Sequence, residues 1–413
     1  MKLLVDVTPL RTRRAFRNLW AGGAVSAVGS QFNSFAAMYA VWHLTGSSLL
    51  VGLLSLAAGI PLIAIALVGS MFIDSVDRAA LARRATIGMM CTSVLMAWAV
   101  LEGWVTALIV LTAVASALGA LAGPARRALT PTVVTKKELG AAYALSSLSF
   151  QVSMLIGPGL AALVATRASL PVCFLIDAAS FVVALAGLHG LHRPPEDANT
   201  DRGVQAAVAG FRFAAGQPVV RSALLCDLVA TVLAMPFALF PALSQQRFHG
   251  DAQTLAWFTT AIAVGGVIGS ALSGVITHRD RPGRVMVSCA LTWGVALAVT
   301  GISHALPITL GMLAIAGMAD TWSVTSRTTL VQSATPDRLR GRLSALEQII
   351  GAGGPNLGNF RAGAVGNVIG AGPAMSLGGL TCVAAITGIL VTGRELRSYE
   401  IPTDTTEVPA SVG

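Results

Sequence analysis

The sequence predicts an all-α membrane protein with twelve transmembrane helices in two pseudo-symmetric six-helix bundles. Charged residues make up only 11% of the 413 residues and hydrophobic residues 54%, whereas a soluble domain carries about 25% charged residues. Between Asn18 and Ile73 there is no Asp, Glu, Lys or Arg, and this stretch is long enough for two helices of about 20 apolar residues each. The composition therefore excludes an ordinary water-soluble enzyme.

Apolar runs alternate with short basic clusters along the chain. Leu49–Ile73 is apolar on every side, whereas a membrane β-strand would alternate with period two, so helices are predicted. The expected spans are 18–43, 49–73, 82–102, 104–128, 140–166, 169–190, 218–244, 252–277, 284–303, 306–332, 342–368 and 371–393.

The basic residues predict the orientation of these spans. Of the 28 Lys and Arg residues, all but Arg167, Arg247 and Arg361 fall at the two termini or in alternate loops on the same side. Short cytoplasmic loops carry such an excess of Lys and Arg, so we expect both termini in the cytoplasm. The net charge of +9 is then an orientation signal, and no nucleic acid partner is expected.

The longest expected connection lies in the middle of the chain. Val204, Val208 and Phe211 recur there at helical spacing, which predicts an interfacial helix. We expect a six-helix bundle at 1–190, a cytoplasmic linker with this helix at 191–217, a second bundle at 218–396 and a polar tail at 397–413.

The two predicted bundles also share loop residues at a separation of 200. The recurring residues are Arg127, Thr135 and Leu139 in the first half and Arg327, Thr335 and Leu339 in the second. Parallel repeats of this kind are typical of secondary transporters, whose substrate site lies near the membrane midplane between the repeats.

Several segments carry a resemblance to a known family. They are GSMFIDSVDRAALARR, ALAGPARRALTPTVVTKKELGAAYAL, LVQSATPDRLRGRLSAL, FLIDAASF and RPGR. With them the chain resembles the major facilitator superfamily from about Arg11 to Arg397, and in particular the branch of bacterial enterobactin exporters and drug-efflux proteins. The resemblance implies the major facilitator fold in the bacterial cytoplasmic membrane, with spans one, four, seven and ten lining a central cavity.

The resemblance also implies residues that take part in conformational change. The loop after span two matches the family's Gly-x-x-x-Asp-Arg-x-Gly-Arg-Arg/Lys pattern only at Asp74 and Arg78, and Gly157-Pro158 resembles the bend motif of proton-coupled exporters without its second glycine pair. We therefore expect a conformational gate that involves Asp74, Arg78, Arg127 and Arg327, and a helix bend at Gly157 and Pro158.

Four carboxylates lie within the expected spans: Asp177, Asp227, Asp320 and Glu347. A charge at the centre of a span costs about 2.5–3.5 kcal/mol, so such residues usually face the protein interior and mark a pathway or a partner. They are either proton carriers or members of structural ion pairs, such as Asp320 with Arg361 or Arg327.

Polar and aromatic residues near these acids complete the candidate site. Arg361 is interpreted either as the counter-ion of a buried acid or as a contact for an anionic substrate, and Asn33 either as a substrate contact or as a helix-to-helix hydrogen bond. The candidate proton-coupling and cavity residues are Asp227, Asp320, Glu347, Arg361, Asn33 and Trp322.

No motif predicts catalysis. The six histidines show no metal-ligand spacing, and neither a phosphate-binding loop nor a serine elbow is present, so we expect neither an enzyme nor a cofactor. The predicted function is export of a small amphipathic molecule, such as a siderophore, antibiotic or drug, by proton antiport. The alternatives are a proton-coupled nutrient importer and a non-transporting membrane sensor or scaffold. We expect a monomer whose partners are the small-molecule substrate, protons and membrane lipids.

Overall fold

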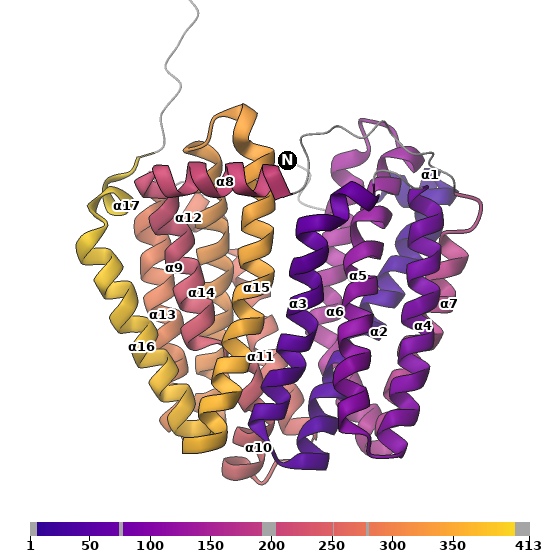
Figure 1. Ribbon diagram of the computed structural model, residues 1–413, viewed down its shortest axis with the longest axis horizontal. Coiled ribbons are helices and arrows are strands. Elements are labelled where there is room, and N and C mark those ends of the chain that lie inside the picture. Colours follow the sequence, from indigo (N-terminus) through magenta and orange to yellow (C-terminus); the bar gives the residue numbers. More distant parts are fainter. Residues whose placement is uncertain (1–5, 74–76, 192–203, 251, 278–280, 401–413) are drawn as a thin grey trace, which may run out of the picture.

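The protein forms two side-by-side bundles of long helices (Figure 1). The computed structural model describes residues 6–73, 77–191, 204–250, 252–277 and 281–400, and within these ranges the regular structure is entirely helical. The first bundle contains α1 (Thr8–Thr12), α2 (Arg14–Thr45), α3 (Ser48–Ile73), α4 (Arg78–Leu101), α5 (Val105–Val133), α6 (Leu139–Arg167) and α7 (Leu170–Gly187). The second contains α8 (Val204–Gly216), α9 (Pro218–Ala234), η1 (Phe237–Leu239), α10 (Phe240–Phe248), α11 (Ala252–Ala271), α12 (Gly274–Thr277), α13 (Pro282–Ile302), α14 (Leu306–Ser333), α15 (Asp337–Ile369), α16 (Ala371–Thr392) and α17 (Arg394–Ser398).

Local sequence signals set several helix boundaries. Helix α2 ends at Thr45 and is capped by Gly46, which has a left-handed backbone (φ 61°) and donates its N–H to the Trp42 carbonyl over 2.7 Å between N and O. Glycine adopts this conformation without a Cβ penalty. At the start of α4 the Asp77 carboxylate accepts a bond of 2.8 Å from the Ala79 N–H, as a helix cap does.

Ten helices described by the structure are long and apolar enough to cross a membrane. Helices α2 and α15 are as long, 32 and 33 residues, but are not among these ten. They carry polar residues such as Asn33 in α2 and Asn359 and Arg361 in α15, which lower their hydropathy. The prediction of many apolar helical spans is confirmed.

The predicted helix over 218–244 is wrong in one respect, because it is not continuous. Helix α9 ends at Ala234, and the chain resumes through η1 into α10. The cause is Pro236, which has no N–H to donate and clashes with the carbonyl four residues earlier. It also disfavours helical backbone at Met235, whose ψ is 124°.

The two bundles meet through two equivalent helix pairs. Helix α3 packs against α15, and α6 packs against α11. In each pair the second long helix of one bundle meets the fifth long helix of the other, as a pseudo-twofold repeat requires. Glycines allow the close approach: a Cβ at Gly52 would lie only 2.9 Å from the Asn359 carbonyl, and one at Gly363 only 3.0 Å from the Gly52 Cα. Small residues at such contacts bring helices together in lipid.

Hydrogen bonds tie the bundles together at one end. Helices α1, α8 and α17 lie at one end of the molecule, here named the terminal end, and α10 lies at the opposite, far end (Figure 1). At the far end the Trp42 indole N–H donates to Gln245 Oε1 over 2.8 Å, and the Ser47 hydroxyl bonds Asn367 Oδ1 over 3.0 Å. Each bond joins the first bundle to the second, so the bundles are connected at the far end.

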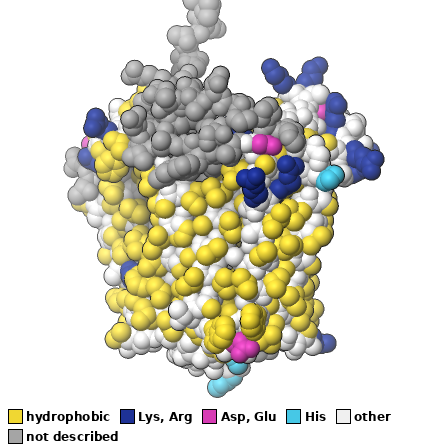
Figure 2. Space-filling view, turned by 45° about the vertical axis from the view of Figure 1, so that its right-hand side comes forward, with side chains coloured by type: hydrophobic (Ala, Val, Ile, Leu, Met, Phe, Trp, Pro, Cys, Tyr) yellow, Lys and Arg dark blue, Asp and Glu magenta, His cyan; other side chains and the backbone are white. Residues whose placement is uncertain are grey.

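The surface has a broad hydrophobic belt (Figure 2). Hydrophobic side chains cover the middle of the face in view, and most of the Lys and Arg side chains visible on it gather toward the terminal end. This pattern suits a protein surrounded by lipid between two polar interfaces.

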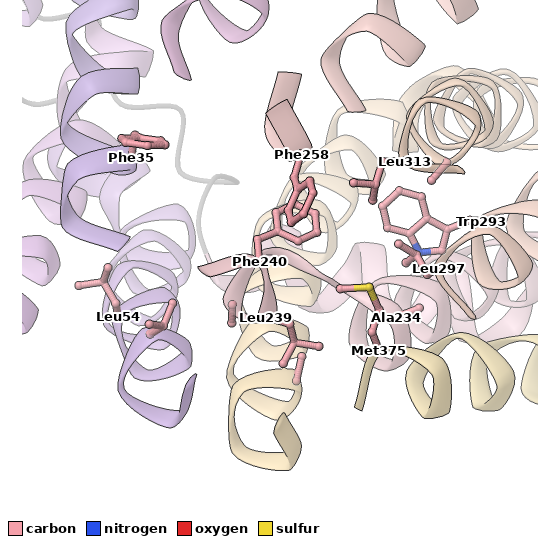
Figure 3. Close-up of a cluster of buried hydrophobic side chains, with 14 of the residues drawn as sticks. Phe35, Leu54, Ala234, Leu239, Phe240, Phe258, Trp293, Leu297, Leu313 and Met375 are labelled. Carbon is pink, nitrogen blue, oxygen red and sulfur yellow. The ribbon is translucent and has the colours of Figure 1, made fainter. Parts of the chain in front are cut away.

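A cluster of buried hydrophobic side chains includes the residues that follow the break in the helix (Figure 3). Phe240 of α10 and Phe258 of α11 are fully buried and meet edge to face with ring centroids 5.5 Å apart. Leu239 lies beside them at the break. The interrupted backbone is thus packed on its apolar side by aromatic rings.

At the terminal end, Glu138 fastens the α5–α6 connection to the N-terminal helices. Its carboxylate accepts bonds from the Thr135 N–H (2.9 Å) and hydroxyl (2.8 Å) and from Arg13 Nε (3.2 Å), and Thr12 donates to its other oxygen. The bonds from Thr135, followed by the Arg13 charge, lower the pKa of Glu138 below its ordinary value.

We expect Glu138→Gln to loosen α1 at neutral pH. Because the folded-state pKa lies below the unfolded one, the contribution of Glu138 is present above the usual glutamate pKa and is lost as pH falls through the folded value. Hydrogen exchange over residues 8–12 should therefore rise in the variant at pH 7 and converge with the wild type in acid. Equal exchange at pH 7 would contradict the role assigned to Glu138.

Candidate functional site

A cavity of about 450 Å³ lies between the two bundles. Helices α2, α3, α5 and α6 line it from one side, and η1, α11, α14 and α15 from the other. Its polar lining is mostly uncharged: Gln31, Asn33, Ser34, Ser55, Thr112, Gln151, Thr259, Thr321 and Asn356. Phe35, Met38, Met154 and Phe237 supply much of its apolar surface. A mostly apolar pocket with a few polar groups is the usual form of a small-molecule site.

Asp320 is the one charged side chain among the described residues that line this cavity. It lies on α14 and is exposed to the cavity space. Asp320 thus lines the cavity, and the prediction that it faces the substrate path stays a prediction. Arg327 lies seven residues further along α14 but pairs with other acids, so the alternative pairing of Asp320 with Arg327 is wrong.

Arg327 lies between two carboxylates on two other helices. Its guanidinium forms an ion pair with Asp227 of α9, and its Nε lies 3.8 Å from Glu347 Oε1 of α15. The side chains are only 9%, 9% and 11% exposed for Arg327, Asp227 and Glu347. One cation thus joins two acids from three helices in a buried ion cluster.

The charge of this cluster follows from its composition. One guanidinium and two ionised carboxylates leave one net negative charge, which is unfavourable in a site shielded from water. The cluster is neutral when it holds one additional proton.

The first bundle holds a separate buried acid, Asp177 of α7. Its Oδ2 accepts from Asn33 Nδ2 over 2.8 Å and from the Ser93 hydroxyl over 2.7 Å, while its buried Oδ1 has no hydrogen-bond partner. Asn33 therefore forms a helix-to-helix bond and lines the cavity as well. The sequence placed Asp177 within a span but did not predict its partners, which lie on α2 and α4.

Arg361 does not pair with a carboxylate within the described part of the chain, and it is not among the cavity-lining residues. Its guanidinium donates instead to two backbone carbonyls of α9, those of Val232 and Leu233. The interpretation of Arg361 as the counter-ion of a buried acid is therefore wrong. The feature of the sequence that could have indicated the role of Arg361 is Pro236, because a proline interrupts α9 and leaves a carbonyl without its usual donor.

Trp322 also lies away from the cavity lining. Its indole N–H donates to the Gly269 carbonyl of α11 over 2.8 Å, so it fastens α14 to α11. Pro158 does line the cavity, and the neighbouring Gly157 faces the Gln31 side chain of α2, with no room for a Cβ. The expected bend residues therefore form a close α6–α2 contact.

The expected gate residues lie in different surroundings. Asp74 is outside the described residues, Arg78 is buried at the start of α4, Arg127 is exposed, and Arg327 belongs to the buried ion cluster. Arg127 and Arg327 are repeat-related in sequence, and among the described residues an ion pair is found for Arg327. The joint role of these four residues as a gate stays a prediction.

The described side chains include no group of three or more His, Cys, Asp or Glu residues that could hold a metal ion. The chemistry available at the cavity is hydrogen bonding and one carboxylate charge.

Comparisons with known proteins agree with this architecture. The profile of the family described as "Transmembrane secretion effector" matches residues 5–409. The enterobactin exporter EntS of Citrobacter koseri is 24% identical over 406 residues, which cover 97% of this chain and 96% of that protein. The enterobactin exporter EntS of Shigella boydii serotype 4 is 25% identical, with 88% of each chain covered.

Solved structures share the fold at low sequence identity. The nucleoside transporter NupG superposes with a TM-score of 0.73 at 11% identity, covering 92% of this chain and 99% of that one. A bacterial homologue of the iron transporter ferroportin, solved in an inward-facing state, gives 0.68 at 15% identity and covers 93% and 99%.

We expect Asp177→Ala to destabilise the first bundle, because it removes the charged acceptor that the Asn33 amide and the Ser93 hydroxyl share. The amide keeps Ser93 Oγ and the hydroxyl keeps the Met89 carbonyl as partners, so the cost is that of lost hydrogen bonds to a charged group, about 1.5–3 kcal/mol each. The midpoint of thermal unfolding in detergent should fall clearly, whereas Asp177→Asn, which keeps an acceptor oxygen, should fall less. Equal midpoints for the wild type and the alanine variant would show that the contacts are dispensable.

Proposed function

Because the chain belongs to the transmembrane secretion effector family and is a major facilitator superfamily transporter of the enterobactin exporter branch, we propose that it exports a small amphipathic molecule by proton antiport. The candidates are a siderophore, an antibiotic or a drug. The relatives named as exporters favour outward transport over nutrient uptake, and the central cavity favours transport over a scaffold role. It is not an enzyme.

The proposed topology has twelve spans, with α2 and α15 added to the ten apolar helices. Their polar side chains, such as Asn33 and Asn359, are in contact with protein rather than lipid, which makes lower hydropathy compatible with a span. The excess of Lys and Arg assigns the terminal end to the cytoplasm. The chain is then a monomer of two bundles, 1–190 and 218–396, joined by a cytoplasmic linker at 191–217 with α8 on the membrane surface, and followed by a tail at 397–413.

The observation that carries proton coupling is the ion cluster of Arg327, Asp227 and Glu347. Two acids that share one cation favour uptake of one proton, and the three residues come from three helices of the same bundle. Asp320, two turns along α14, presents a carboxylate to the substrate cavity. A proton bound at the cluster and a substrate bound beside Asp320 therefore influence each other through α14.

Transport then follows when the protein alternates between a state closed at the far end and a state closed at the terminal end. In this proposal the bonds Trp42–Gln245 and Ser47–Asn367 close the far end, and the cavity is then reached from the cytoplasm. Substrate entry, closure of the terminal end and rupture of the far-end bonds would expose the cavity to the outside. A proton moving inward releases about 2.3 kcal/mol per 100 mV, which can drive the outward step.

We expect Asp227→Asn and Glu347→Gln to abolish uncoupler-sensitive accumulation of substrate in everted membrane vesicles. The probes are enterobactin and the dye Hoechst 33342. Each substitution removes one proton-binding carboxylate from the cluster. Glu102→Gln, an exposed acid that accepts a bond from Trp98, is the matched control and should retain transport.

Two outcomes decide this proposal. Vesicles of both cluster variants that still accumulate a probe in an uncoupler-sensitive manner would exclude proton coupling through the cluster. Wild-type vesicles that move neither these probes nor a panel of other amphipathic compounds would count against the export function itself.

We expect Gln245→Leu to increase exposure of the cavity to the outside. The change removes the acceptor of the Trp42 bond, and a net hydrogen bond of about 1 kcal/mol corresponds to roughly a fivefold shift in a two-state equilibrium. The readout is labelling of Met38→Cys, on the cavity wall, by a membrane-impermeant maleimide added outside cells, with the natural cysteines replaced. Gln217→Leu at the terminal end is the control. Unchanged labelling in Gln245→Leu would show that the Trp42–Gln245 bond has no role in closing the far end.

A further inference from the structure

The interruption of helix α9 leaves backbone groups on both sides of the break without their normal helical partners. Pro236 has no N–H for the Val232 carbonyl, and the change of direction at Met235 separates Phe237 from the Leu233 carbonyl and Ala238 from the Ala234 carbonyl. Inside a membrane such groups must find partners within the protein.

Helix α15 supplies partners for three of these groups, the Val232 and Leu233 carbonyls and the Ala238 N–H, with two side chains. Arg361 Nε donates to the Val232 carbonyl over 2.9 Å, and its Nη2 donates to the Leu233 carbonyl. On the other side of the break, the Ala238 N–H donates to Asn359 Oδ1 over 3.3 Å. The two residues therefore hold the backbone before and after Pro236.

The guanidinium charge adds to this arrangement. The carbonyl end of a helix carries a partial negative charge, and a cation there is favourable. A glycine of α16 leaves space for the cation, because a Cβ at Gly378 would lie 2.9 Å from Arg361 Nη2. The contact between α9, α15 and α16 is thus built around this arginine.

The segment that Arg361 and Asn359 hold forms part of the cavity wall. Phe237 and Ala238, directly after the break, line the cavity together with Asn356 of α15. Beyond them, α10 carries Gln245 to its bond with Trp42. The position of the break therefore sets both the wall of the cavity and the start of the segment that closes the far end.

We propose that Arg361 and Asn359 are positioning residues that hold the broken helix α9 so that Phe237 and Ala238 form the binding wall of the cavity. This inference rests on the proposed function in taking the cavity as the substrate site. Arg361 acts through the backbone of α9 and does not touch the substrate.

A double-mutant cycle on stability tests the backbone part without any substrate. Pro236→Ala restores an N–H at the position where Val232 lacks a partner. If Arg361 donates to carbonyls that lack a partner because of Pro236, Arg361→Met should matter less once Pro236→Ala restores a donor. The midpoint of thermal unfolding should then fall by less in the Pro236→Ala background than in the wild type. Arg247→Met is the matched control, because Arg247 also donates to a carbonyl, that of Ser303 over 2.7 Å, but far from the break, so its effect should be the same in both backgrounds.

Folding failure is also informative in this cycle. An Arg361→Met protein that folds only together with Pro236→Ala supports the proposal, whereas one that fails in both backgrounds, or loses the same stability in both, overturns it. Arg361→Lys, which keeps the charge but not the planar fork that reaches two carbonyls, should lie between wild type and Arg361→Met.

Transport kinetics test the positioning part. With Hoechst 33342 or enterobactin as the probe, Asn359→Ala and Arg361→Lys should raise KM by about tenfold, a change on the scale of one lost polar contact, while the number of protons exchanged per substrate stays unchanged. Unchanged KM in both variants, with an active wild type, would overturn the positioning role. An inactive wild type would count against the proposed function alone, because the stability cycle still decides the role of Arg361.

Discussion

Polar groups removed from water inside a membrane must be satisfied by other groups of the same protein, and this constraint organises the structure. A free peptide carbonyl, a lone carboxylate or a lone guanidinium each costs several kcal/mol in hydrocarbon. The described chain meets the constraint at three places. Asp177 accepts from Asn33 and Ser93, Arg327 joins Asp227 and Glu347, and Arg361 occupies the carbonyls at the end of α9.

Each of these arrangements connects different helices of one bundle. The Asp177 contacts join α2, α4 and α7, and the Arg327 cluster joins α9, α14 and α15. Bonds of this kind hold each bundle as a unit, because breaking them would leave buried charge unpaired. The contacts between bundles are different in kind: glycine-mediated packing along α3 and α15, and neutral hydrogen bonds at the far end. A neutral bond of about 1 kcal/mol is easier to exchange than a buried ion pair, and this difference suits two rigid halves that move relative to each other.

Much of the fold could be predicted from the sequence. Apolar runs of about 20 residues can only be satisfied as helices in lipid, so the helical segments were close to those observed. The broken segment at Pro236 was missed because its flanking residues are all apolar, and hydropathy does not distinguish a continuous helix from an interrupted one. For the site, burial within a span marked Asp227, Asp320 and Glu347, but their roles differ: Asp320 faces the cavity, whereas the other two share Arg327.

The sequence by itself determined the membrane class, the helix positions and the small set of charged residues that had to lie inside the protein, since these depend on composition along the chain. Only the tertiary structure decided which partner each charge takes. Arg327 could reach Asp320 by helical spacing alone, yet α9 and α15 bring Asp227 and Glu347 closer. Arg361 was expected either at a buried acid or at an anionic substrate, yet it binds the Val232 and Leu233 carbonyls next to the break at Pro236. The reason is physical: a buried charge takes the nearest unsatisfied group in three dimensions, and for these arginines that group lies on another helix, far away in the sequence.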